Sequence, residues 1–357
     1  MEKNTTLCYL ERDGKYLMLH RISKKNDINR DKWIGVGGHF LEDESPDDCL
    51  LREVKEETGY ILRSWKYRGI VTFISGTGIT EYMSLFTSDD FEGESIDCDE
   101  GKLEWVEKEK IWELELWPGD KIFFMLLEED GPFFSLKLVY DSQGNLVEAV
   151  KDGKPMELFD LLHEDGTRSG QRQERGVVHR EGLLHETVHM WIVRPRKDEG
   201  FDVLLQKRSR NKDSYPGCLD ISSAGHMNAG DLPLQAAVRE MREELGLTVQ
   251  EDELEFVQPF YLTFDECFHG KPFHDREFAN LFVLRKNFDL QDLKLQEEEV
   301  ETVVWMDLDT CISSVLAGEK SEAFPHCLRP DELQIIRQYL AETRREEHDR
   351  PSHTTGI

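Results

Sequence analysis

The chain has 357 residues, enough for two or three domains that each bury a core of their own. With 38% hydrophobic and 33% charged residues, it has the composition of a soluble globular protein. Its formal net charge of −29 excludes a nucleic-acid backbone or an anionic membrane as the expected partner, because like charges repel.

Two alternating strands are expected first, over residues 4–11 and 15–20, with a hairpin turn at Asp13 and Gly14 between them. A polar loop follows over residues 21–31 and carries a run of basic side chains. Such a run often serves solubility alone. The alternative is a set of phosphate contacts, made by Arg21, Lys24 or Lys25.

A helix rich in acidic side chains is predicted to begin at Pro46 and to stop at Gly59. Three of its glutamates stand at positions i, i+3 and i+4 and share one face: Glu53, Glu56 and Glu57. Like charges on one face repel each other, so helix stability does not account for them. A divalent cation does, because Mg²⁺ prefers oxygen ligands and keeps several waters, which suits an open carboxylate cluster that receives a diphosphate. The alternative is a solvated acidic helix.

The stretch from Gly38 to Tyr60 resembles the Nudix box, GX5EX7REUXEEXGU, where U is apolar. Every fixed position matches, and Tyr60 is a loose fit at the last one. The resemblance implies a Mg²⁺-dependent hydrolase of compounds linked through a nucleoside diphosphate, in which Mn²⁺ could substitute. It implies that Arg52 is a structural partner of Glu44. It also implies the metal ligands, which would be the Gly38 carbonyl, Glu53, Glu56 and Glu57.

Two further strands are expected over residues 66–75 and 80–87, and the acidic pair Asp99 and Glu100 follows them. In the Nudix family an acidic residue from this region often adds a metal ligand or a general base, and Glu100 fits that role. The resemblance therefore implies that Glu56 or Glu100 takes the proton of the attacking water, which bound metal makes more acidic.

Residues 116–138 are similar to the oxidised-purine nucleoside triphosphate diphosphohydrolases, which include MutT-like proteins. There the tryptophan of a WPDD-like segment packs on the base and paired aspartates bind its edge. Trp117 and Asp120 match, whereas Gly119 replaces the first aspartate and Ile34 replaces a base-contacting asparagine. The resemblance implies that the first domain converts purine triphosphates such as 8-oxo-dGTP to the monophosphate and pyrophosphate. A core tryptophan beside a helix start is the alternative.

A second copy of the box occupies residues 225–247 in the same register, with Asp231 where the first copy has a glutamate. The two glycines that open the copies lie 187 residues apart, too far for a solenoid repeat, so two whole domains in tandem are predicted. Asp231 would brace Arg239, although its shorter side chain reaches less far. The second set of metal ligands would be the Gly225 carbonyl, Glu240, Glu243 and Glu244.

Residues 156–345 are similar to the isopentenyl-diphosphate isomerase branch of the same superfamily. Arg208 and Lys212 match basic residues that hold the diphosphate there. Three more residues match metal-binding histidines and an acidic residue of the isomerase centre: His185, His226 and Glu277. The isomerase moves a proton with a cysteine just before the Gly-His pair, and Ala224 stands there instead. We therefore expect a hydrolase on an isomerase-like frame, with isomerase activity as the less favoured alternative.

The predicted fold is α+β, with two tandem Nudix folds that are each a mixed β-sheet sandwiched between helices. A polar joint at residues 151–155 separates the domains. The predicted divisions are residues 1–152, residues 156–346 and a disordered tail over residues 347–357. Glu298 or Glu299 would take the part of Glu100 in the second domain. The substrate of that domain stays open, and a non-catalytic nucleotide sensor is its alternative.

The seven cysteines include no CxxC pair and are typical of reduced thiols. The amino-terminal stretch lacks the apolar core of a signal peptide, and no run of residues has membrane-spanning length. The expected compartment is the cytoplasm. The expected partners are nucleotides or other small diphosphates, without nucleic acid or membrane, and the sequence predicts no oligomeric state.

Overall fold

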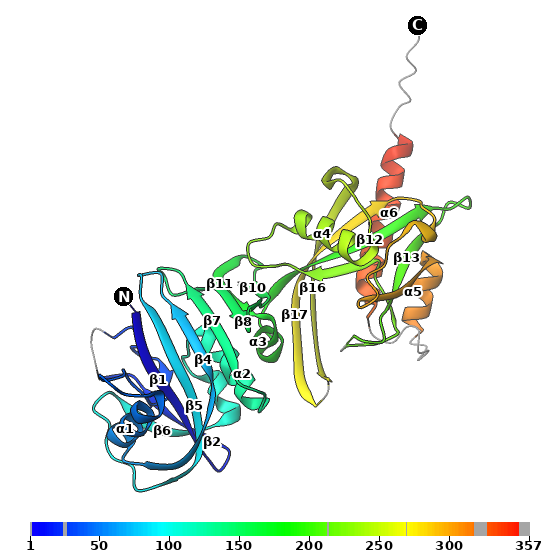
Figure 1. The fold of residues 1–357 in the computed structure, drawn as a ribbon. Coiled ribbons are helices and arrows are strands. Elements are labelled where there is room, and N and C mark those ends of the chain that lie inside the picture. The colour runs from blue at the N-terminus through cyan, green and yellow to red at the C-terminus, as the bar shows by residue number, and fades with distance from the viewer. Residues whose placement is uncertain (1, 24–26, 213, 269, 318–326, 350–357) are drawn as a thin grey trace. The chain divides into compact units, whose positions relative to one another are not determined.

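The computed structural model describes the chain except residues 1, 24–26, 213, 269, 318–326 and 350–357, and it describes residues 271 and 346–349 by their backbone alone. Lys24, Lys25 and most of the predicted tail lie outside the described residues. The chain forms two compact units, one of residues 1–161 and 168–181 and one of residues 162–167 and 182–357. Each unit holds a mixed sheet with helices (Figure 1), which confirms the α+β class.

The first unit is built on a sheet in the order β3-β2-β1-β5-β4-β7-β8-β9, with β6 paired to β2. Its strands are β1 (Glu2–Arg12), β2 (Lys15–His20), β3 (Trp33–Ile34), β4 (Ile61–Ile74), β5 (Thr80–Glu92), β6 (Lys102–Glu107), β7 (Phe134–Tyr140), β8 (Leu146–Lys151) and β9 (Lys154–Pro155). Its helices are α1 (Pro46–Thr58), the 3₁₀ helix η1 (Lys108–Glu113) and α2 (Pro118–Glu128). The next elements are β10 (Leu158–Leu162), β11 (Arg168–Glu174) and α3 (Arg175–Glu181). β5 runs past the predicted end at residue 87. The prediction stopped there because the last residues of the strand, SDDFE, carry no alternating apolar pattern.

Helices α1 and α2 pack on opposite faces of this sheet, since successive residues of β1 point to opposite faces. Leu10 packs with Leu50 and Val54 of α1. Tyr9 points the other way, and its ring centroid lies 4.8 Å from that of Phe124 in α2. The predicted sandwich of one sheet between helices is therefore present in the first unit.

The box helix α1 begins and ends where the sequence predicts. The Ser45 hydroxyl accepts a hydrogen bond from the Asp48 N–H, and the Asp48 carboxylate accepts one from the Ser45 N–H, so the two residues form a capping box ahead of Pro46. Gly59 ends the helix at a φ of 76°, a left-handed conformation that favours glycine. The three box glutamates therefore lie in the second half of a helix with defined ends.

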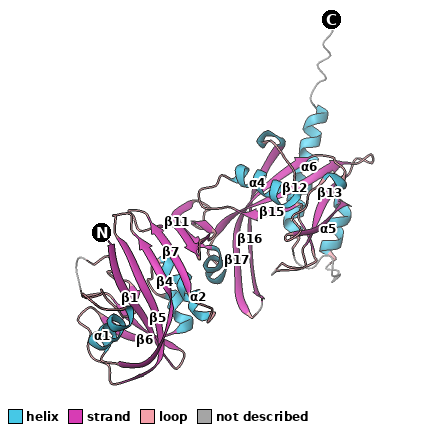
Figure 2. Ribbon diagram, in the orientation of Figure 1, coloured by secondary structure: helices cyan, strands magenta, loops and turns pink. Residues whose placement is uncertain are grey.

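The second unit is arranged around β12, which pairs antiparallel with β13 and β15 and parallel with β17. Its strands are β12 (His185–Pro195), β13 (Phe201–Arg208), β14 (Leu219–Asp220), β15 (Ser223–His226), β16 (Leu254–Phe268), β17 (Lys271–Arg285) and β18 (Val300–Asp307). Its helices are α4 (Pro233–Leu245), η2 (Glu251–Glu253), η3 (Leu290–Asp292), α5 (Leu308–Leu316) and α6 (Pro330–Asp349). β16 and β17 form the long hairpin seen in Figure 2.

Two apolar clusters place the helices of the second unit on the two faces of its sheet. Val188 and Met190 of β12 pack with Met241 of α4. Trp191, the next residue along the strand, belongs to the cluster that holds Leu333 of α6, together with residues of α5. None of the helices in the described part of the chain combines the length and the apolar character that a membrane crossing requires.

Candidate active sites

In the first unit the three box glutamates have different surroundings. Glu53 lies against Gly38 so closely that a Cβ at position 38 would be 2.3 Å from the Glu53 Oε1 atom. Glu57 is buried, and its Oε2 atom accepts a hydrogen bond from the Gly37 N–H at 2.9 Å. The side chain of Glu56 is 62% exposed. The glycine turn therefore holds two carboxylates and leaves the third open to solvent.

Arg52 braces the turn from the same helix. Its Nε and Nη2 atoms bind both oxygens of Glu44, at 2.6 and 2.8 Å, and its Nη2 atom also donates to the His39 carbonyl at 3.1 Å. These hydrogen bonds from Arg52 hold the pKa of Glu44 down at about 2. The Nη1 atom of Arg52 donates to Glu53 at 2.6 Å, so the arginine joins the brace to the carboxylate cluster.

The second box repeats this geometry. A Cβ at Gly225 would lie 2.1 Å from the Glu240 Cδ atom. Glu244 accepts hydrogen bonds from the Ser223 hydroxyl at 2.6 Å and the Ala224 N–H at 3.3 Å. Burial raises the pKa of Glu244 to about 7, although the Ser223 hydrogen bond and Lys212 lower it. The remaining box carboxylate, Glu243, is 47% exposed.

The brace of the second box is looser than that of the first. Arg239 donates to the His226 carbonyl at 3.1 Å and to Glu240 at 2.6 Å, as Arg52 does to the matching groups. Its hydrogen bond to Asp231 measures 3.3 Å and involves a single carboxylate oxygen. This matches the shorter reach expected of an aspartate.

Each box lies beside an ion pair made of a predicted phosphate ligand and a predicted downstream acid. In the first unit Arg21 binds both Glu100 and Asp27. The pKa of the Cys98 thiol is raised by burial and by Glu57 of the box helix and lowered by Arg21, so both charged groups act on this thiol.

In the second unit Lys212 binds Glu299, and Lys212 also lowers the pKa of the box residue Glu244. Arg208, the other predicted phosphate ligand there, instead binds Asp220 at 2.8 Å and Ser214. A substrate phosphate would therefore compete with carboxylates of the chain for all three basic residues: Arg21, Arg208 and Lys212.

Trp117 stands directly before α2, and its indole is partly exposed. Its Nε1 atom donates to the Asn29 Oδ1 atom at 2.8 Å, and the Lys32 ammonium lies 5.6 Å from its ring centroid. The rings of Phe73 and Tyr140 meet it edge-on. The indole is thus fixed in orientation beside an ammonium group, which the sequence did not predict.

Asp120 is buried in the first turn of the same helix. Burial raises its pKa to about 8, against the lowering effect of Lys32. Gly119 lies against Tyr140, since its N–H donates to the Tyr140 hydroxyl at 2.9 Å and a Cβ at position 119 would lie 2.4 Å from that oxygen. Tyr140 therefore fills the place that a second aspartate would need, and this explains the departure from the WPDD pattern.

Histidine and carboxylate groups gather near β15 in the second unit. Donor atoms of His185, Asp275 and Glu277, all buried, lie within 4.8 Å of one another. His226 stacks on His185 with ring centroids 5.3 Å apart. One imidazole with two carboxylates is a donor set that suits a divalent cation such as Zn²⁺ or Mn²⁺. Asp275 was missed from the sequence, and its spacing of two residues from Glu277 on a strand was the available signal.

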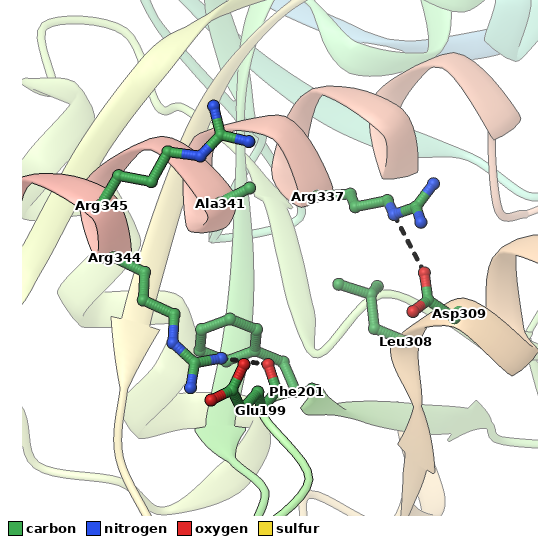
Figure 3. A pocket seen from close by; sticks show the side chains of 9 residues that line it. Glu199, Phe201, Leu308, Asp309, Arg337, Ala341, Arg344 and Arg345 are labelled. Carbon is green, nitrogen blue, oxygen red and sulfur yellow. Dashed lines mark hydrogen bonds and ion pairs between the residues drawn. The ribbon is translucent and has the colours of Figure 1, made fainter. Parts of the chain in front are cut away.

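A separate pocket of about 450 Å³ in the second unit lies between α6, α5 and the start of β13 (Figure 3). Arg337 of α6 binds Asp309 there at 2.9 Å, and Arg344 donates to the Glu199 carbonyl. The described residues that line this pocket include none of the predicted site residues. We assign it no part in the chemistry of the boxes.

The NUDIX domain model matches the chain twice, over residues 1–127 and 183–327. The chain belongs to the Nudix family. This confirms the family assignment made from the two boxes and makes the protein a pyrophosphohydrolase. Nudix hydrolases act on small molecules linked through a nucleoside diphosphate and generally use divalent metals.

Three known proteins are similar to part of this Nudix chain. Nudix hydrolase 3 of Arabidopsis thaliana is 40% identical over 153 residues, which are 42% of this chain and 19% of that protein. The oxidized purine nucleoside triphosphate hydrolase of Danio rerio is 30% identical over 127 residues, or 35% of this chain and 79% of that protein. The crystal structure of a MutT protein from Bacillus halodurans is 26% identical and covers 43% of this chain and 99% of its own, with a TM-score of 0.39.

Proposed function

We propose that the first domain hydrolyses purine nucleoside triphosphates, oxidised ones such as 8-oxo-dGTP among them, to the monophosphate and pyrophosphate. The observation that carries this proposal is the pairing of a partly exposed Trp117 with a buried Asp120. The indole offers a face on which a base stacks, and the carboxyl offers hydrogen bonds to its edge. The similarity to an oxidized purine nucleoside triphosphate hydrolase supports the same substrate class.

The raised pKa of Asp120 allows this carboxyl both to donate and to accept a hydrogen bond. With a pKa of about 8 it is mainly protonated at neutral pH, so one oxygen donates a hydrogen bond while the other accepts one. An ionised aspartate would only accept. Purine edges carry both donors and acceptors side by side, and the neutral form matches such an edge with a single side chain.

The box residues fit a hard divalent cation, for which we propose Mg²⁺ with Mn²⁺ as a substitute. Because Gly38 has no side chain, the Glu53 carboxylate occupies the space that a Cβ would fill. The Glu56 carboxylate is exposed to solvent. The cation, when bound, neutralises phosphate charge and makes the attacking water more acidic. Glu56 or Glu100 then takes the proton of the water, while Arg52 keeps Glu53 in place and Glu57 fixes the turn.

For the second domain we propose hydrolysis of another diphosphate, with Glu240, Glu243 and Glu244 in the matching roles. Arg208 and Lys212 would bind the substrate phosphates after release from their carboxylates. His185, Asp275 and Glu277 would hold a further divalent cation. The looser brace at Asp231 favours a non-catalytic nucleotide sensor as the second candidate, and Ala224 leaves isomerase activity the least favoured. We place the protein in the cytoplasm.

The protonation of Asp120 gives a test that depends on pH. Because its pKa is raised, the neutral carboxyl is present below about 8 and is lost as the pH rises through that value. The KM for the purine triphosphate should rise about tenfold between pH 7 and 9. The facing groups Tyr9 and Tyr140 have pKa values raised well above their usual range by burial, so neither should titrate between pH 7 and 9.

The matched variant is Asp120→Asn, whose amide keeps a donor and an acceptor but does not titrate. Its KM should be flat over the same pH range, measured as pyrophosphate release at saturating Mg²⁺. An equally steep rise of KM in Asp120→Asn would show that another group is responsible and would remove Asp120 from the base site.

A further inference from the structure

A line of buried polar side chains crosses the second unit on the face opposite the box helix. Thr187, His189 and Trp191 alternate along β12 and so point to one face of the sheet. Helix α6 packs on that face, and its first turn carries Glu332, which is 2% exposed. Glu277, on the neighbouring strand β17, lies opposite His185 in the parallel register and is also buried.

One imidazole joins the two carboxylates. The Glu332 Oε1 atom accepts a hydrogen bond from Trp191 Nε1 at 2.7 Å and lies 3.0 Å from His189 Nδ1. The other ring nitrogen, His189 Nε2, lies 3.4 Å from Glu277 Oε2. The same Oε2 atom accepts a hydrogen bond from the Thr187 hydroxyl at 3.1 Å. Each nitrogen of the ring thus faces its own carboxylate.

Three ionisable side chains, His189, Glu277 and Glu332, are therefore buried together on this face of the sheet. Buried ionic groups of this kind rarely stabilise a fold more than apolar residues of the same size would. Stability alone is therefore a weak reason for three ionisable groups at this place.

The position of Glu277, at the other end of this line of side chains, gives a better reason. Glu277 is one of the three residues, with His185 and Asp275, whose donor atoms lie within 4.8 Å of one another. Ligands of a metal ion are commonly oriented by hydrogen-bonded partners behind them, and loss of such a partner costs about 10- to 100-fold in metal affinity. Thr187 donates to the Glu277 Oε2 atom and His189 faces the same atom, so this carboxylate has two partners of that kind at one of its oxygens.

We propose that His189 and Glu332 are positioning residues that hold Glu277 in place for a divalent cation at the group of His185, Asp275 and Glu277. The proposal rests on the cation site assigned above to the second domain, and it adds the carboxy-terminal helix α6 to that site. Glu332 acts through His189 and touches neither cation nor substrate. The Trp191 indole N–H donates a hydrogen bond to the Glu332 Oε1 atom and so helps to fix its position.

The test uses the full-length protein and Co²⁺ as the probe. Co²⁺ bound to an imidazole gives hyperfine-shifted proton resonances of the histidine ring, which a purely carboxylate site does not give, so this signal separates the His185 group from the two boxes. His185→Ala should abolish it. In Glu332→Gln, which keeps the size of the side chain and an acceptor for Trp191, the Kd for Co²⁺ read from this signal should rise about 10- to 100-fold.

The matched control is Glu255→Gln. Glu255 also joins a strand to α6, since it accepts hydrogen bonds from Arg285 and from Tyr339, but the described structure gives it no contact with His189 or Glu277. Its Kd for Co²⁺ should equal that of the unchanged protein. If Glu332→Gln does not fold, as judged by thermal unfolding, Glu332→Asp takes its place, because it keeps the charge and shortens the side chain.

The outcomes separate the two proposals. A histidine signal that persists in His185→Ala, or that is absent from the unchanged protein, would overturn the cation site itself. A signal that depends on His185 but has the same Kd in the Glu332 variant would overturn the positioning role alone. A Kd that rises in the Glu332 variant and not in Glu255→Gln would support both.

Discussion

Gly38→Ala is expected to lower turnover by the first domain about 100-fold or more while the protein stays folded. The new Cβ would lie 2.3 Å from the Glu53 carboxylate, which is the far end of a flexible side chain and moves away at low cost to stability. A displacement of about 1 Å in a reacting group is enough for a loss of this size. Pyrophosphate release from a purine triphosphate, together with a thermal unfolding curve, measures both parts of the expectation.

The control for this change is Gly131→Ala. A Cβ at position 131 would meet no atom within 4 Å, so the variant tests the substitution itself without the contact. Gly131→Ala should turn over substrate at the original rate. A Gly38→Ala protein with normal kcat would contradict the account of the turn as a close cradle for Glu53.

Glu56→Gln is expected to reduce kcat in the first domain by about 10²- to 10⁴-fold, the range for loss of a general base. The side chain is 62% exposed and its described contact is a 3.3 Å interaction with Arg52, so the isosteric amide should leave the unfolding temperature unchanged. The separation of a large kinetic effect from a negligible stability effect is what distinguishes a reactive carboxylate from a structural one.

Glu92→Gln is the matched control, because Glu92 is 51% exposed and binds Arg63 in a surface ion pair that includes none of the box glutamates. It should be indistinguishable from the unchanged protein in single-turnover and steady-state pyrophosphate release. If Glu56→Gln retained a third or more of the original kcat, the proton would have to go elsewhere, and Glu100 would become the base.

The sequence predicted those features of the molecule that depend on short spacing. The ends of α1 at Pro46 and Gly59 and the shared face of its glutamates follow from helix periodicity and capping chemistry, which act within a few residues. The weaker reach of Asp231 follows from the length of one side chain. Local rules of this kind are carried by the order of residues alone.

Features that join distant segments were not predictable. Glu332 looks like an ordinary acidic residue in the first turn of a helix, yet it meets His189 across 143 positions of the chain. The ion pair of Arg21 with Glu100 and the approach of Tyr140 to Gly119 depend likewise on how strands pair. The residue pattern of one segment does not show which side chain of a distant segment will contact it. Such contacts can be identified only once the fold is known.

The most direct test of the central claim is product analysis with 8-oxo-dGTP and dGTP, in the presence of Mg²⁺, for the intact protein and for Trp117→Ala. Pyrophosphate and the monophosphate are the expected products from 8-oxo-dGTP. The KM should rise in Trp117→Ala as the stacking face is lost, by an amount equivalent to about 1–3 kcal/mol. Absence of pyrophosphate from either triphosphate, or a KM unchanged in Trp117→Ala, would contradict a purine triphosphate as the substrate of the first domain.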